Sequence, residues 1–521
     1  MSTLDSLSPL LLANILSYCT PVDKLVFALT SKRSWIKWQE LGPSDKDIYT
    51  PRPSLVTSKL DQNQKQLFIP PNTKILELEG DNHQPIDPGT IPNSVTTLWY
   101  DINHPLPPGV IPSSVVNLEI SSFFDHDLEQ DSLPSSITDL KFCFYNRRLL
   151  PSVFPTSLTK LSIFRDDPTP MEVIFPLPPS ITDFTLLSDI NPMEWHSTIH
   201  ALPSLTTLSV GRFTPAPNIG FVPNCVTTLD ILSFDHNLTV GLLPHGLKTL
   251  NIKCEFNRRL CPGMLPPTLT HLSLGSHFNQ KLLADGSLPQ GLLHLDVSDT
   301  YDQTIAEDVL PTTLKSLIFG LPANERCNQL RLPSQLEQLR IGNCGVALVD
   351  IPKGIKYLSL KSKKLLSELK ELPITLETLS LDCSMLNSLF KRLGQYPSLC
   401  HIEGRSDTFT ENCLPMLPPN LRSVAVKLDN MSEQIVLPDS VQDIVVHLEH
   451  LPQDLRECIQ VMKQNKTISS LMAAKRAFSI RNFRSHLLSG YHVRHNIFGG
   501  WTLLFFSHHE YTFISPVDWN K

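Results

Sequence analysis

The stretch Leu265-Pro266-Pro267-Thr268-Leu269-Thr270-His271-Leu272-Ser273-Leu274 recurs in altered copies along most of this chain of 521 residues. In fifteen of the eighteen copies the proline is followed by apolar residues at the third, sixth and eighth positions after it; the first copy has Thr73 at the third position, and the copies at Pro203 and Pro397 are one residue shorter. Positions are numbered here from that proline, so Leu272 stands at +6. A fixed internal period of this length is the signature of a repeat protein.

Eighteen copies can be aligned on their prolines, at intervals of 19 to 25 residues. The aligning residues are Pro70, Pro92, Pro112, Pro134, Pro155, Pro178, Pro203, Pro223, Pro244, Pro266, Pro289, Pro311, Pro333, Pro352, Pro373, Pro397, Pro418 and Pro438. Apolar residues at +6 and +8 alternate with mostly polar residues at +5 and +7, which is the period of a strand with one buried face. Proline fixes φ and lacks an N–H, so it suits the corner before a strand.

One copy is too small to bury its own leucines, so neighbouring copies must stack and pair their strands in parallel. We therefore predict an α/β fold, a leucine-rich-repeat-like solenoid in which a curved parallel β stack carries one strand per copy at +5 to +9. The leucines expected in one buried column are Leu98, Leu118, Leu140, Leu229, Leu250, Leu272 and Leu317.

A second motif follows the strand in several copies. It is clearest in Phe278-Asn279-Gln280-Lys281-Leu282, and 124–128, 145–149, 234–238 and 256–260 repeat it. The aromatic ring can fill the interior where the strand ends, and the Asn or Asp side chain can satisfy backbone groups of a turn. Stacked in register, these asparagines would form a ladder.

The Leu-Pro pair, the spaced leucines and Phe-Asn-x-x-Leu together resemble the FNIP repeat, a leucine-rich-repeat variant of social amoebae and their giant viruses. The resemblance covers residues 67 to about 450, which we expect to form the solenoid. After about Ala323 the Phe-Asn motif fades, and the later copies resemble generic leucine-rich repeats.

Residues 1–45 do not follow the repeat and carry signals for two short helices. Ser8-Pro9 and Thr20-Pro21 are typical helix starts, and Val22, Leu25, Val26 and Leu29 form a helical apolar stripe. One interpretation is a helical cap for the solenoid. The other is an F-box, which this segment resembles and which docks on the Skp adaptor of cullin–RING ubiquitin ligases. That resemblance places Leu7, Pro9, Ile15, Leu16 and Leu25 on the docking surface or its support.

Residues 46–66 are interpreted as a linker and residues 451–521 as a helical, basic cap. Leu455, Ile459 and Met462 suggest a helical stripe, and no Asp or Glu occurs from Cys458 to His509. A solenoid needs its last apolar edge covered. The alternative for this region is a basic contact for an acidic partner or nucleic acid.

The net charge of −7 gives no global basic field for nucleic acid or anionic membrane. Neither a signal peptide nor an apolar run long enough to span a membrane is recognised, so we expect a cytoplasmic protein. No GxSxG, GxxxxGK[ST], HExxH or strand-linked GxGxxG motif occurs. We therefore expect no enzyme activity, no catalytic or metal-binding residues, no cofactor and no small-molecule ligand.

These observations favour a non-catalytic protein-binding repeat protein, as the substrate-recognition subunit of a Skp–cullin–F-box ligase. The alternative is an interaction scaffold with no link to ubiquitin. An unknown protein substrate is expected on the concave face, where +5 and +7 side chains point away from the core. The candidates are Trp99, Glu119, Lys141, His271, His294, Arg340 and Tyr357. Trp99 is either a binding hot spot or a ring shielded by long neighbouring side chains.

Overall fold

The computed structural model describes residues 69, 73–79, 86–121, 124–145, 147, 149–164, 176–298, 300–306, 308–320, 331–342, 351–361, 369, 371–381, 393–405, 408–409, 413–428, 437–438, 440–441, 443–448, 477–482, 490–495, 501–506 and 511–517. They fall in two compact units, one within Leu55–Leu389 and one that includes Phe390–Lys521. The residues expected in the N-terminal helices and the linker lie outside this set, Leu7, Pro9, Ile15, Leu16 and Leu25 among them.

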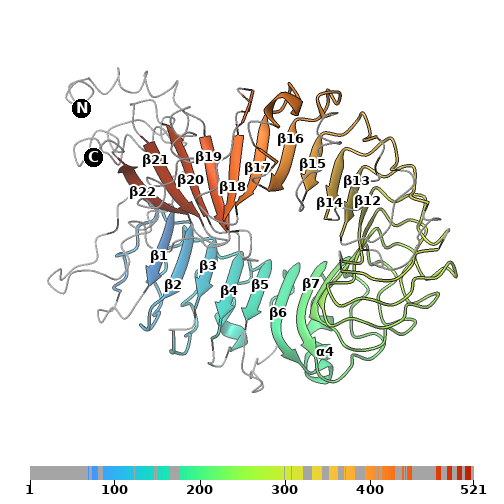
Figure 1. Ribbon diagram of the computed structural model, residues 1–521. Coiled ribbons are helices and arrows are strands. Elements are labelled where there is room, and N and C mark those ends of the chain that lie inside the picture. Colours follow the sequence, from blue (N-terminus) through green and yellow to red (C-terminus); the bar gives the residue numbers. More distant parts are fainter. Residues whose placement is uncertain are drawn as a thin grey trace, which may run out of the picture. The chain divides into compact units, whose positions relative to one another are not determined.

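The first unit is a parallel β-solenoid with one strand in each copy of the repeat (Figure 1). Its strands are β1 (Ile75–Glu79), β2 (Thr97–Asp101), β3 (Asn117–Ile120), β4 (Asp139–Cys143), β5 (Lys160–Phe164), β6 (Asp183–Ile190), β7 (Thr207–Phe213), β8 (Thr228–Ser233), β9 (Thr249–Cys254), β10 (His271–Ser273), β11 (His294–Asp296), β12 (Ser316–Phe319), β13 (Gln338–Ile341), β14 (Tyr357–Leu360) and β15 (Thr378–Leu381). Each strand from β1 to β14 pairs in parallel with the strand of the next copy.

The +6 residues form one continuous buried column, as the spacing predicted. Leu229, Leu250 and Leu272 are direct register partners in β8, β9 and β10. Each is no more than 2% exposed. The other predicted leucines, Leu98, Leu118, Leu140 and Leu317, are buried to the same degree. The +8 and +3 residues line the same interior, so every copy of this unit except the first, which has Thr73 at +3, contributes three apolar side chains to a core that runs along the stack.

The proline corner is a closed turn in nearly every described copy. The +3 N–H donates to the carbonyl of the proline, as in Val95 to Pro92 at 3.0 Å and Leu269 to Pro266 at 3.1 Å. A hydroxyl at +2 adds a bond to the preceding copy. Thr268 Oγ1, for example, donates to the Leu247 carbonyl at 2.8 Å. Sequence reasoning missed this second bond, although Ser or Thr at +2 recurs in the repeat.

The aromatic residues after the strands form the predicted interior stack. The rings of Phe256, Phe278 and Tyr301 succeed one another with centroids 5.8 and 6.0 Å apart and planes 6° apart. The asparagine ladder is also present. Asn257 Oδ1 accepts from the Asn279 N–H at 3.0 Å, and Asn279 Oδ1 accepts from the Asp302 N–H at 2.8 Å. Each side-chain amide thus satisfies a backbone donor one copy further on.

One helix, α4 (Pro192–His200), interrupts the regular coil between β6 and β7. Asn191 caps it, since its Oδ1 accepts from the Met193 N–H at 3.1 Å, and Pro192 occupies the first turn. Trp195 and Ile199 are buried beneath the helix. Among the described residues, no helix is long and apolar enough to cross a membrane.

The second unit departs from the expected helical C-terminal cap. It contains β16 (His401–Arg405), β17 (Ser423–Leu428), β18 (Asp443–Leu448), β19 (Ala477–Asn482), β20 (Gly490–His495), β21 (Trp501–Phe506) and β22 (Tyr511–Val517). Parallel pairing runs from β16 to β19, and β19 to β22 then pair antiparallel.

The prediction of helix is therefore wrong for the described residues from 477 to 517. Segments such as Trp501–Phe506 are rich in aromatic residues and too short for a helical stripe, a composition that favours strands. The predicted stripe of Leu455, Ile459 and Met462 lies outside the described residues.

Candidate protein-binding face

The +5 and +7 side chains of β1 to β15 make one surface, which we call the strand face. The strands alternate between half-exposed and buried residues, so the strand face lies opposite the leucine column. Because the strands pair in register, each side chain has a counterpart in the next strand, about 4.8 Å away. The strand face is thus an ordered two-column array that extends over fifteen strands.

The predicted residues lie on this surface in three separate groups. Trp99, Glu119 and Lys141 are consecutive register partners in the +7 column of β2, β3 and β4. His271 and His294 are partners in the +5 column of β10 and β11. Arg340 in β13 and Tyr357 in β14 stand in different columns of neighbouring strands and are not register partners.

The first group combines a carboxylate, an ammonium group and aromatic rings. Lys141 Nζ lies 3.1 Å from Glu119 Oε2 and 5.0 Å from the centroid of the Phe164 ring. The Cys143 thiol donates to Glu119 Oε1 at 3.3 Å. Burial, followed by the charge of Glu119, raises the pKa of the Cys143 thiol to about 12, so this thiol stays protonated. Trp99 is half-exposed between two fully buried neighbours, Leu98 and Tyr100, which confirms its predicted register.

The centre of the strand face is a polar ladder that sequence reasoning did not single out. Asp230 Oδ2 accepts from the Ser209 hydroxyl at 3.2 Å, and Asp230 Oδ1 accepts from Asn251 Nδ2 at 2.7 Å. Three register partners therefore share one hydrogen-bonded chain across β7, β8 and β9. Such a chain holds its side chains in fixed positions.

The histidine pair lies beyond this ladder. The rings of His271 and His294 are stacked, with centroids 4.2 Å apart and planes 14° apart. Burial lowers the pKa of His294, and the charges of His271 and Lys315 lower it further. The pair is an aromatic surface flanked by hydroxyl residues, Thr249 and Ser316, in the same column.

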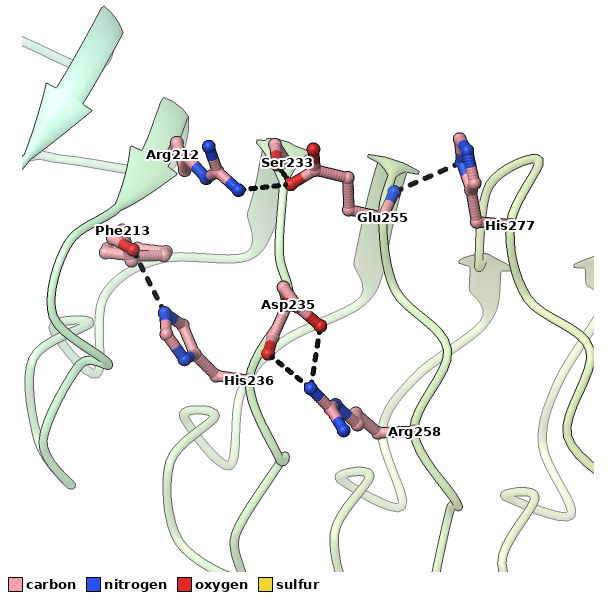
Figure 2. Close-up of polar contacts among 8 residues, drawn as sticks. All are labelled: Arg212, Phe213, Ser233, Asp235, His236, Glu255, Arg258 and His277. Atoms are coloured by element: carbon pink, nitrogen blue, oxygen red, sulfur yellow. Dashed lines mark hydrogen bonds and ion pairs between the residues drawn. The ribbon is translucent and has the colours of Figure 1, made fainter.

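A polar rim borders the strand face where β7, β8 and β9 end (Figure 2). The Glu255 carboxylate pairs with Arg212 Nη2 at 3.0 Å and accepts from the Ser233 hydroxyl. The Glu255 N–H donates to His277 Nδ1 at 3.3 Å. This arrangement differs from a nucleophilic triad, which places a histidine between the serine and the acid.

Further along the rim, Arg258 Nη2 donates to Asp235 Oδ1 at 2.8 Å, and His236 Nε2 contacts the Phe213 carbonyl oxygen at 3.0 Å (Figure 2). Each bond joins one copy to the next. The rim therefore braces neighbouring turns. Among the described residues, no group of three or more His, Cys, Asp or Glu side chains could hold a metal ion.

The comparison with protein families matches the repeat directly. The FNIP Repeat profile matches residues 61–99, 102–144, 124–166, 234–277 and 278–321. The chain contains FNIP repeats. These matches include the aromatic and asparagine ladders, and the last ends at 321, close to where the Phe-Asn motif fades. The FNIP repeats of 234–277 and 278–321 carry the histidine pair, whereas the polar ladder and the rim begin before residue 234.

No curated protein sequence matches this chain. Among solved structures, the chain is similar to one described as "The crystal structure of CroV588 a novel circular LRR protein structure". The two are 26% identical with a TM-score of 0.49, and the alignment covers 73% of this chain. It spans 57% of that protein, just over half of its length.

Proposed function

We propose that this chain is a non-catalytic protein-binding repeat protein that holds a protein partner on its strand face. One observation carries the proposal. The strand face presents in-register, mostly half-exposed side chains over fifteen strands, while the interior beneath it keeps nearly the same pattern of three apolar residues in each copy. The interior is thus uniform and the strand face is not. A partner can be selected by the variable columns without any change to the fold.

The chemistry of the strand face suits a protein surface. It offers an aromatic residue, an ion pair and hydrogen-bonding groups, spread over many strands. Small molecules are usually held in concave, mostly apolar pockets that bury most of the ligand. A nucleic acid would favour a basic surface, whereas this chain has a net charge of −7.

The finer part of the proposal concerns the amino-terminal segment. We propose that residues 1–45 dock on a Skp-type adaptor, which would make the chain the substrate-recognition subunit of a cullin–RING ubiquitin ligase. The support is the F-box resemblance, which assigns the docking surface to Leu7, Pro9, Ile15, Leu16 and Leu25. The second candidate is a scaffold with no link to ubiquitin, in which these helices only cap the solenoid.

Site-directed cross-linking tests the partner-binding proposal. A photo-reactive amino acid at Ser162, or at Ser209, which is the register partner of the +7 residue Asp230, should cross-link a bound partner in the full chain. The same amino acid at Val240, an outer-turn residue that is 62% exposed, should not. Equal cross-linking yields from the strand face and the outer turn would show that the strand face is not the binding surface.

The adaptor proposal is tested separately with purified Skp adaptor and the full chain. The double change Ile15→Asp with Leu25→Asp should abolish adaptor binding without lowering the melting temperature of the repeats. The double change Ile219→Asp with Ile374→Asp is the matched control, because it adds the same charge at two repeat residues that are each 67% exposed. If wild-type chain does not bind the adaptor, or if the double variant melts earlier, the cap interpretation is favoured.

A further inference from the structure

The helix α4 is an insertion in an otherwise regular coil. It lies between β6 and β7, where the repeat prolines Pro178 and Pro203 are 25 residues apart, the longest interval in the array. α4 is the only α-helix whose two ends both lie in the described part of the chain. Insertions in repeat proteins map to one face and often carry function. No part of the strand-face proposal requires α4.

The exposed side of α4 carries three potential metal ligands in one stripe. Met193, His196 and His200 follow one another at i, i+3 and i+7, and a helix with 3.6 residues per turn brings these positions to one side. Met193 is 71% exposed, and both histidines are exposed. The two imidazole rings are stacked, with centroids 4.3 Å apart and planes 17° apart.

A hydrogen bond determines which ring nitrogen of His200 is available to bind a metal. His200 Nε2 lies 2.8 Å from the Gly220 carbonyl oxygen. A carbonyl can only accept, so Nε2 carries the proton and Nδ1 keeps its lone pair. Metal-binding histidines typically donate their other ring N–H to a carbonyl or carboxylate in this manner. Gly220, in the neighbouring copy, therefore orients His200 as it would orient a metal ligand.

We propose that α4 binds one copper ion through His196 and His200, with the Met193 thioether as a third ligand. Two histidines at i and i+4 on one side of a helix form a metal-binding pair. Imidazole ligands bind Cu²⁺ most tightly among the divalent first-row metals, and a thioether favours Cu⁺. The proposed ligands include no carboxylate. The neighbouring Glu194 side chain already accepts from Asn191 Nδ2 at 2.8 Å. The His196 ring is exposed, so it can turn toward an ion held at His200 Nδ1 without displacing the core.

The other stacked histidine pair is a natural control within the same chain. His271 and His294 are similarly close, but they lie on strands and are partly buried. Burial lowers the pKa of His294, the charges of His271 and Lys315 lower it further, and the positive charge of Lys315 opposes the binding of a cation there. The strand pair should therefore bind copper much more weakly than α4.

The test is a titration of the full chain with copper sulfate, followed by calorimetry and by electron paramagnetic resonance. His196→Ala and His200→Ala should each remove one Cu²⁺ site and its nitrogen hyperfine signal, while His271→Ala should remove none. Met193→Leu should keep the Cu²⁺ site and weaken Cu⁺ binding, which is measured in a separate anaerobic titration with copper sulfate reduced by ascorbate. The variants His196→Gln and His200→Gln repeat the test with polar side chains, and circular dichroism confirms that each variant is folded.

Two results would overturn the proposal. One is that the His196→Gln and His200→Gln variants bind as many Cu²⁺ ions per chain as the wild type. The other is a site lost equally in His271→Ala, which would assign the copper to the strand pair. Because no step uses the strand face, failure here leaves the protein-binding proposal standing.

Discussion

Leu250 shows what a single side chain contributes to a solenoid. It is fully buried in β9, with Leu229 and Leu272 as its register partners on either side. We expect Leu250→Ala to lower the free energy of unfolding by about 2–5 kcal/mol, because the cavity cannot close between two fixed neighbours. Denaturant unfolding measures this loss. Lys253→Ala, an exposed change in the same strand, should cost far less, and similar losses would contradict the buried column.

Trp99 lies in a strand with the same alternation of buried and half-exposed residues, but its side chain is on the strand face and not in the core. It is half-exposed in the +7 column, beside Glu119, whose carboxylate is already paired with Lys141. We expect Trp99→Ala to weaken partner binding by at least about 1 kcal/mol, the usual threshold for a hot spot, because a large rigid ring is lost from the contact. The melting temperature should hardly change. Binding that is unaffected would favour a ring shielded by its neighbours.

Tyr301 connects the aromatic stack to the pH dependence of stability. Burial raises the pKa of its phenol to about 12, and its hydroxyl donates to the Gln280 carbonyl at 3.1 Å. In an unfolded chain a tyrosine titrates near pH 10. The stability due to this shift is therefore complete below about pH 10 and is lost as the pH rises toward 12.

The free energy of unfolding should accordingly fall between about pH 10 and pH 12, and less steeply in Tyr301→Phe than in the wild type. Denaturant titrations at a series of alkaline pH values measure the slope. Tyr357→Phe, on the strand face, is the control. Its slope should follow the wild type, and an unchanged slope in Tyr301→Phe would refute the assignment.

At the scale of elements, the ladder that joins successive turns depends on one acceptor in each copy. Asn257 Oδ1 accepts both from the Asn279 N–H and from Gln280 Nε2, each at 3.0 Å. Asn257→Ala should cost about 1 kcal/mol in unfolding experiments, the usual value of one hydrogen bond. Asn257→Asp keeps an oxygen at the same place and should retain most of this stability. Equal losses in the two variants would mean that the ladder is incidental.

The elements also show where sequence reasoning succeeds. Leu272 and Phe278 were placed correctly because their burial follows from a period repeated many times. A misaligned copy is recognised by comparison with the other copies. The strand face was located for the same reason, since +5 and +7 must oppose +6. The motif also implied the Asn257 ladder, because a short polar side chain beside a turn has few other partners.

Side-chain contacts between residues of different copies could not be predicted from the repeat period. Glu255 meets Arg212 across two strands, and neither residue belongs to a repeated motif. The α4 stripe was missed because it occurs once and so has no second copy against which it could be recognised. The carboxyl-terminal strands were missed because Leu455, Ile459 and Met462 suggested a helical period that was extended to residues after 477, where strands are formed.

At the scale of the whole molecule, the first unit is a one-dimensional stack, in which each copy contacts mainly its neighbours. Its stability should then depend on the number of complete copies and on whether their strands stay in register. Removing residues 251–272 joins Leu250 to Ser273 and deletes one full period, so the +6 column stays continuous. Phe278 would then stack on Phe234, and the Asp235 carboxylate could accept from the Asn279 N–H in place of Asn257.

We expect this full-copy deletion to keep the circular dichroism of the parent chain and to unfold cooperatively, with only a modest loss of stability. Removing 251–261, which deletes half a period, places turn residues in the buried column and should destroy the fold from that point. Circular dichroism, thermal unfolding and limited proteolysis distinguish the two outcomes. Equal tolerance of both deletions would contradict stacking in register. A full-copy deletion that unfolds the chain would show that contacts beyond nearest neighbours stabilise it.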